Sequence, residues 1–309
     1  MNINMKKMLF NIMSLLIVLV IALTAGCGQE KKSSENGPAD GKLKIITSFY
    51  PMYITALNVA DGVDGVEIVN MTKPQTGCLH DYQLTTEDMK LLATGNVMIV
   101  NGGGMESFLD KVTKSQSKLK IIDSSEGIPM LKDDEHGEEN PHVWVSVANA
   151  ILQVDNVVKG LSEADPAHKE RYEANGKVYK EKLQKLQADM HQRLDKYQGR
   201  QIITFHEAFP YFAQEFNLKL AGIIEREPGS EPTPEELEET IKLIQSLGIK
   251  VIFTEPQYSS KAAQTIANAT GAQISTLDPV VTGDATPDAK DAYIKVMEQN
   301  AQALEAAFQ

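Results

Sequence analysis

Three of the chain's six histidines share one position relative to the predicted strands. His80 lies in a loop after one short apolar run, His142 follows another, and His206 comes directly after a third. Asp278 holds the same place after the last apolar run. Because ligands bind beyond the carboxyl ends of strands in open α/β sheets, these four side chains are expected to meet. Three neutral imidazoles and one carboxylate suit a tetrahedral Zn²⁺ ion.

The preference for zinc over manganese depends mainly on His206. Manganese favours more oxygen ligands, so a carboxylate at this position would have indicated Mn²⁺. Glu207 is adjacent, but neighbouring side chains point in different directions and are not expected to bind one ion. We therefore assign Glu207 a supporting place beside the site or at a helix N-terminus.

The other three histidines are assigned to solvent. His168 and His191 lie in a long charged segment that is expected to be helical. His136 lies in the acidic stretch 133–140, which could collect metal weakly, although a solvated loop is the interpretation we favour.

Cys78 lies two residues before His80, where a soft thiolate could join a metal site. We favour a buried thiol that takes no part. Glu255 follows a predicted strand, and two roles stay open for it: it could approach the ion or support the strand end.

Short apolar runs alternate with helical segments, which predicts parallel sheets flanked by helices. The pattern occurs twice, so we predict an α/β fold of two lobes. The predicted strands are 43–47, 66–70, 97–100, 119–122, 201–204, 218–222, 251–254 and 273–277, and the predicted helices are 52–60, 85–93, 105–114, 208–216, 234–247, 261–270 and 289–307.

A single long helix is predicted to join the lobes. From Pro166 to about Tyr197, Lys, Glu, Gln, Ala and Leu dominate, and apolar residues form one stripe. Roughly 30 residues at about 1.5 Å each give a rod of about 45 Å. The predicted divisions are a signal peptide at 1–26, a flexible tether at 27–41, an N-terminal lobe at 42–150, connecting helices at 151–199 and a C-terminal lobe at 200–309.

The first residues have the form of an export signal. Lys6 and Lys7 precede a largely apolar stretch over residues 8–25, which is short for a stable membrane span. Leu-Thr-Ala-Gly-Cys at 23–27 resembles the bacterial lipoprotein processing box, and this resemblance implies that Cys27 carries lipid after cleavage. A plain transmembrane anchor stays open as an alternative. The polar residues 28–41 are expected to tether the folded part to the membrane.

Charge and cysteine content limit the function classes. The chain has a formal net charge of −12, which becomes −14 once the two signal lysines are removed. Such an acidic chain is not expected to bind nucleic acid, which requires clustered Lys and Arg. The chain has two cysteines, Cys27 and Cys78. Lipidation of Cys27 would therefore leave Cys78 without a disulfide partner.

Five motifs in order resemble the zinc/manganese solute-binding lipoproteins of ABC transporters. They are Gly77–Tyr82 with its His-x-Tyr, Asn-Pro-His-Val-Trp at 140–144, Thr-Phe-His-Glu-Ala-Phe-Pro-Tyr-Phe at 204–212, Phe-Thr-Glu-Pro-Gln at 253–257 and Leu-Asp-Pro at 277–279.

This resemblance implies that His80, His142, His206 and Asp278 are the metal ligands. It also implies that the ion is handed to a membrane permease driven by a cytoplasmic ATPase, and we expect a monomer. Many zinc-specific members carry a long His-rich loop before the second ligand. Here that loop is short and acidic, so Mn²⁺ stays open as an alternative ion.

Two competing functions are weighed against metal capture. A zinc hydrolase normally keeps one coordination position open for water, whereas four protein ligands would close the shell. His206 to Pro210 begins like a zincin helix, but its fifth residue is not His, and the sequence holds neither a Gly-x-Ser-x-Gly motif nor a P-loop. An adhesin with a structural metal is the other alternative. We expect a binding protein and not an enzyme.

Overall fold

The computed structural model describes residues 42–132, 137–224 and 232–309. The description below concerns these residues, which belong to the compact unit Asp40–Gln309. The predicted signal peptide, the lipidation at Cys27, the whole of the predicted tether and His136 lie outside the described residues. Among the described helices, none combines the length and apolar character that a membrane span needs.

The first sheet has four parallel strands in the order β2-β1-β3-β4. Its central strands are apolar, and β3 is buried along its whole length, as expected for a parallel sheet covered on both faces. Thr85 caps the helix that begins at Thr86 with a capping box, in which its side chain and that of Asp88 each bond the other's backbone amide. The elements are β1 (Leu43–Thr47), α2 (Tyr50–Val59), β2 (Val66–Asn70), α3 (Thr86–Leu92), β3 (Val97–Val100), α4 (Leu109–Ser115) and β4 (Lys120–Asp123).

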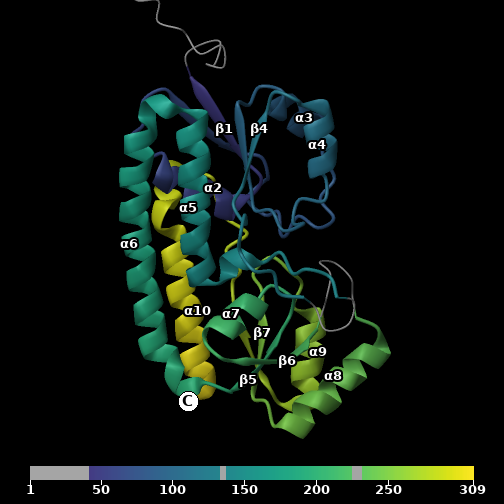
Figure 1. Cartoon of the computed structure of the whole chain (residues 1–309). Helices are drawn as coiled ribbons and strands as arrows, with labels where there is room; N and C mark the ends of the chain where they lie inside the picture. The colour runs from purple at the N-terminus through teal and green to yellow at the C-terminus, as the bar shows by residue number, and fades with distance from the viewer. Residues whose placement is uncertain (1–41, 133–136, 225–231) are drawn as a thin grey trace, which may run out of the picture. The chain divides into compact units, whose positions relative to one another are not determined.

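The second sheet repeats this plan in the order β6-β5-β7-β8, again with all strands parallel (Figure 1). Its own apolar cluster lies between the strands and the helices α8 and α9. The elements are β5 (Gln201–Thr204), α7 (Pro210–Glu215), β6 (Lys219–Ile223), α8 (Pro234–Leu247), β7 (Val251–Thr254), α9 (Lys261–Thr270) and β8 (Gln273–Thr276).

The predicted connecting helix is present as α6 (Lys169–Leu194), extended by short 3-10 turns at Pro166–His168 and Asp195–Tyr197. Its apolar stripe is buried against α5 (Val147–Ala164) and α10 (Ala292–Phe308), which run beside it (Figure 1). The helix touches both lobes, because it packs on α2 and because Gln187 donates a 2.8 Å hydrogen bond to Glu215 of α7. The predicted fold of two α/β lobes joined by one long helix is therefore confirmed.

Three helices begin later than predicted. The helix expected from residue 105 begins at Leu109, because the Glu106 carboxylate accepts hydrogen bonds from the backbone amides of Asn101 and Gly102 and holds a loop there. The helix expected from residue 208 begins at Pro210, which suits the first helical position. The last helix begins at Ala292, after a 3-10 turn at Pro287–Asp291.

Candidate metal centre

Four side chains with metal-binding atoms converge between the two lobes. Cys78, His80, His142 and His206 each offer one such atom, and these atoms all lie within 4.8 Å of one another. Cys78 and His80 come from the loop after β2, and His142 comes from the segment that follows β4. His206 is the second residue after β5. The first lobe thus supplies three of the four groups and the second lobe supplies His206.

Two distances in the cluster match those between the ligands of one zinc ion. The Nε2 atoms of His80 and His142 are 3.3 Å apart, and the Cys78 Sγ lies 3.4 Å from the same His142 nitrogen. Zn–N bonds of about 2.0–2.1 Å in a tetrahedron place two nitrogens about 3.3 Å apart. The His142 ring also lies across the His206 ring at 81°, with centroids 4.9 Å apart. The spacing fits a single tetrahedral ion.

Asn140 orients the central imidazole. Its Oδ1 accepts hydrogen bonds at 3.0 Å from both the backbone amide and the Nδ1 of His142. With Nδ1 donating, the lone pair of His142 Nε2 faces the cluster. The Asn140 Nδ2 donates a 3.0 Å hydrogen bond to the Glu207 carbonyl oxygen of the other lobe. Asn140 therefore holds one of the converging imidazoles and ties its loop to the other lobe, a role that the sequence did not reveal.

Glu255 lies beside His206 and not among the four converging groups. Its Oε1 is 3.4 Å from the His206 Nδ1, and both side chains are 1% exposed. The Gln257 Nε2 donates a 2.6 Å hydrogen bond to the other carboxylate oxygen. Neither His206 Nδ1 nor Glu255 Oε1 has a hydrogen-bond partner within the described part of the chain. A carboxylate on the far nitrogen of a metal-binding histidine orients the ring and makes it a better donor.

Burial lowers the pKa of two of the imidazoles, those of His80 and His142. Desolvation, followed by the charge of His206, lowers the pKa of His80 to about 4, although Asp81 opposes this shift. The pKa of His142 lies well below its usual value because the ring is buried and because His206 and His80 are close. Burial raises the pKa of the Cys78 thiol, with a smaller contribution from Glu255. Neutral imidazoles are the form that binds metal.

Asp278, the fourth predicted ligand, is not among the four converging groups. Asn300 of α10 holds its backbone through two hydrogen bonds of 2.8 Å, and its Oδ1 accepts a 2.7 Å hydrogen bond from the Val280 amide. Burial and then the charge of Glu255 raise the pKa of its carboxyl group. The structure therefore brings three of the predicted ligands together, while ligation by Asp278 stays a prediction.

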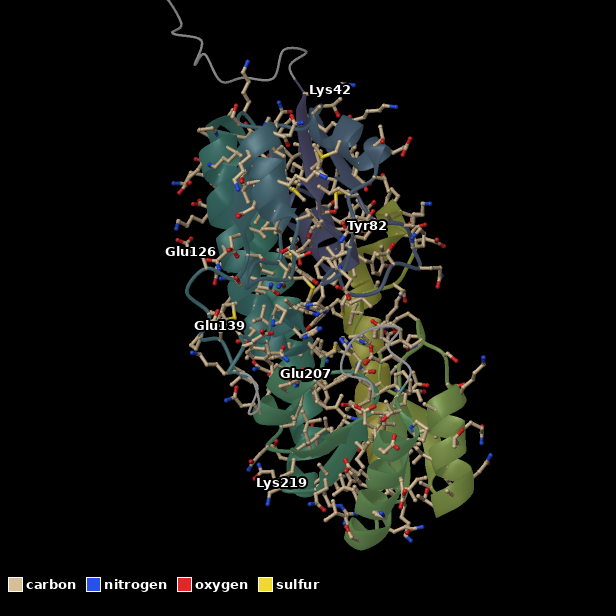
Figure 2. The ribbon with its side chains drawn as sticks, turned by 90° about the vertical axis from the view of Figure 1, so that its right-hand side faces the viewer. Lys42, Tyr82, Glu126, Glu139, Glu207 and Lys219 are labelled. Atoms are coloured by element: carbon tan, nitrogen blue, oxygen red, sulfur yellow. The ribbon has the colours of Figure 1, made fainter. Side chains whose placement is uncertain are left out.

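The remaining predicted residues lie in different places. His168 and His191 are partly exposed on the connecting helix, where they contact Asp165 and Asp195. Glu207 lies next in sequence to His206, and Figure 2 labels it between the levels of Tyr82 in the first lobe and Lys219 in the second. Cys78, which we interpreted as taking no part, lies within the cluster. The one signal in the sequence is its place two residues before His80.

Comparison with known proteins gives one consistent result. Residues 45–307 match the family described as zinc-uptake complex component A, periplasmic. The high-affinity zinc uptake system protein ZnuA of Bacillus subtilis is 32% identical over 308 residues, which cover 93% of this chain and 94% of that protein. The iron-binding protein YfeA of Yersinia pestis is 32% identical over 247 residues, 78% of each chain.

Solved structures agree with the sequence relatives. The solute-binding protein FpvC of Pseudomonas aeruginosa, in complex with Ni²⁺, superposes with a TM-score of 0.76 at 28% identity. The match covers 86% of this chain and 96% of that one. Since the family profile spans nearly all of the described residues and the ZnuA relative aligns along almost its full length, the chain belongs to the family of periplasmic zinc-uptake complex component A proteins.

Proposed function

We propose that this protein captures a divalent transition metal outside the cytoplasm, with Zn²⁺ as the preferred ion, and delivers it to an ABC-type permease for import. The observation that carries this proposal is the convergence of three imidazoles from two lobes, with a 3.3 Å separation of the His80 and His142 nitrogens. Relatives named for zinc, iron and nickel complexes support metal capture as the shared activity.

In this proposal His80, His142 and His206 form the core of the site. Asp278 follows the last strand of the second lobe, and the sequence assigns it the fourth position. His80 and His142 lie in one lobe, so they bind the ion first. The ion sheds water ligands before it binds them. His206 then closes the site from the other lobe. His142 and His206 are buried, which keeps that part of the site away from water, and the low pKa of His142 limits competition from protons.

Delivery follows from the same division of ligands. Separating the lobes withdraws His206 and leaves the ion on the first lobe with an incomplete shell, ready to transfer to ligands of the permease. Anchorage at the membrane would keep this transfer local, and the Leu-Thr-Ala-Gly-Cys sequence at 23–27 supports a lipid on Cys27. Three imidazoles and the Asp278 carboxylate would fill a tetrahedral shell, which favours binding over hydrolysis because a catalytic zinc keeps one position for water.

Calorimetric titration of the metal-stripped protein tests this function. We expect one zinc ion per chain, and zinc should displace Mn²⁺ from protein that has been loaded with manganese. If an equal concentration of zinc does not displace the bound Mn²⁺, the protein would be assigned to manganese uptake. Failure of the protein to bind either zinc or manganese would contradict the proposal.

Replacing Asn140 with alanine should weaken zinc binding by about 10- to 100-fold, the usual effect of losing a partner that orients a metal ligand. The variant loses the hydrogen bonds to the His142 ring and to the Glu207 carbonyl oxygen. Asn156→Ala is the matched control, since Asn156 also donates to backbone carbonyl oxygens but belongs to α5 and bonds the segment after β4. Equal zinc affinity in the two variants would show that Asn140 does not orient the ligand.

Acid should destabilise the metal-free protein between about pH 6.5 and pH 4. The pKa of His80 falls from 6.5 to about 4 on folding, so in this window the unfolded chain binds a proton that the folded chain does not. The free energy of unfolding therefore falls as the pH falls, by at most about 3 kcal/mol for this group. Urea unfolding at several pH values measures this fall in the free energy of unfolding, and the fall should be smaller in His80→Gln. An unchanged slope in that variant would contradict the assignment.

A further inference from the structure

We propose that the Cys78 thiolate is a direct ligand of the captured ion and that it makes the site selective for thiophilic divalent ions such as Zn²⁺ and Cd²⁺. The inference rests on the proposed function, because it concerns the same ion. It differs from the sequence prediction in the fourth ligand, which becomes a sulfur of the first lobe in place of the Asp278 carboxylate.

The position of the sulfur carries the inference. Cys78 Sγ lies 3.4 Å from His142 Nε2, and it lies within 4.8 Å of the metal-binding atoms of His80 and His206 as well. A Zn–S bond of about 2.3 Å and a Zn–N bond of about 2.0–2.1 Å, at the tetrahedral angle, place sulfur and nitrogen about 3.5 Å apart. The sulfur therefore stands where a fourth tetrahedral ligand belongs.

The loop around Cys78 is built to aim this sulfur. Leu79 is fully buried, and its backbone amide donates a hydrogen bond to the Met105 sulfur. The Leu79 side chain therefore fills the first lobe's core. Cys78 and His80, on either side of it, both face the cluster. A Cβ on Gly77 would lie 3.0 Å from the Tyr258 hydroxyl, so the absence of a side chain there lets the loop approach the second lobe closely. Two adjacent packing contacts thus fix the sulfur's position.

The chemistry of the cluster agrees with a thiolate ligand. Cys78 is a buried free cysteine, and metal binding replaces its S–H proton with a metal–sulfur bond while the proton leaves to solvent. One thiolate and three neutral imidazoles leave a bound divalent ion with a single positive charge. Glu255, beside His206, lies close enough to offset that charge. Soft thiolate donors favour Zn²⁺ and Cd²⁺, whereas Mn²⁺ favours oxygen donors.

This ligand set also divides unequally between the lobes. The first lobe then holds three ligands, Cys78, His80 and His142, and the second lobe holds only His206. Separation of the lobes would leave the ion bound to the first lobe by three ligands.

The test uses Co²⁺ as an optical probe and Zn²⁺ for X-ray absorption. Wild-type protein with one Co²⁺ bound should show a thiolate-to-cobalt charge-transfer band in the near ultraviolet, and the zinc-loaded protein should show one sulfur at about 2.3 Å. The Cys78→Ser variant should lose the band and the sulfur shell. Its Cd²⁺ affinity should fall about 100-fold, while its Mn²⁺ affinity changes by less than about threefold. The wild-type spectra decide the question even if the variant fails to fold.

Stoichiometric Co²⁺ binding without the band, together with a zinc shell of nitrogen and oxygen only, would overturn the inference. In that case the proposed function would stand, and loss of affinity in Asp278→Asn would identify the carboxylate as the fourth ligand. Wild-type protein that binds neither Co²⁺ nor Zn²⁺ would overturn both the inference and the proposed function.

Discussion

Replacing His142 and His206 together with alanine is expected to weaken zinc binding by about 10⁴-fold or more. The apparent binding free energy of a four-ligand zinc site is about 10–16 kcal/mol, or roughly 3 kcal/mol per ligand. Loss of two ligands therefore removes about 6 kcal/mol, which corresponds to about four orders of magnitude in Kd. Titration against a zinc chelator of known affinity measures the change.

Two exposed histidines provide the matched control. His168 and His191 lie on the connecting helix and contact Asp165 and Asp195. The His168→Ala, His191→Ala double variant removes the same number of imidazoles, but it should bind zinc like the wild type. Full affinity in the His142 and His206 variant, or an equal loss in both variants, would contradict the location of the site.

Replacing Trp144 with alanine is expected to lower the free energy of unfolding by about 3–5 kcal/mol, the usual cost of emptying a large aromatic site. The Trp144 side chain is 1% exposed and packs edge-on against Phe49, with ring centroids 5.0 Å apart. Its Nε1 donates a 2.6 Å hydrogen bond to the Pro279 carbonyl oxygen, beside Asp278. The substitution therefore removes both a core contact and a link to the Asp278 loop. Urea denaturation with and without zinc measures the loss.

Trp144→Phe separates packing from the hydrogen bond. The phenyl ring keeps most of the apolar volume but cannot donate to Pro279, and a buried carbonyl oxygen left without its donor costs about 1–3 kcal/mol. We expect this variant to be more stable than the alanine variant. If both variants unfold at the same denaturant concentration as the wild type, the link between the 142–145 segment and the Asp278 loop carries no stability.

The strands were predictable because each is a short apolar run bounded by turn residues. Five of the eight have the predicted limits, including β1 and β7. The strands β4 and β6 are shifted by one residue toward the C-terminus, and β8 ends one residue earlier than predicted. The parallel arrangement and the long helix α6 followed from the same patterns. The start of α4 was not predictable from helical propensity, because the Glu106 side chain satisfies backbone amides of Asn101 and Gly102 that only the folded loop presents.

The convergence of the three histidines could be predicted from the sequence because a strand end fixes where the next residue lies. That reasoning applies directly to His206, which follows β5 by two residues. It does not extend to Cys78, whose orientation depends on Leu79 filling the core from the middle of an irregular loop. Nor does it reveal Asn140, whose contact with the Glu207 carbonyl oxygen exists only once the two lobes meet. Contacts between lobes depend on tertiary packing, which local patterns do not encode.

Anomalous X-ray scattering at the zinc edge from crystals of the zinc-loaded protein tests the central claim most directly. The account predicts one strong peak per chain between the lobes, about 2.0–2.1 Å from the ring nitrogens of His80, His142 and His206. A strong peak located elsewhere, for example on exposed carboxylates, with these three imidazoles empty, would contradict it.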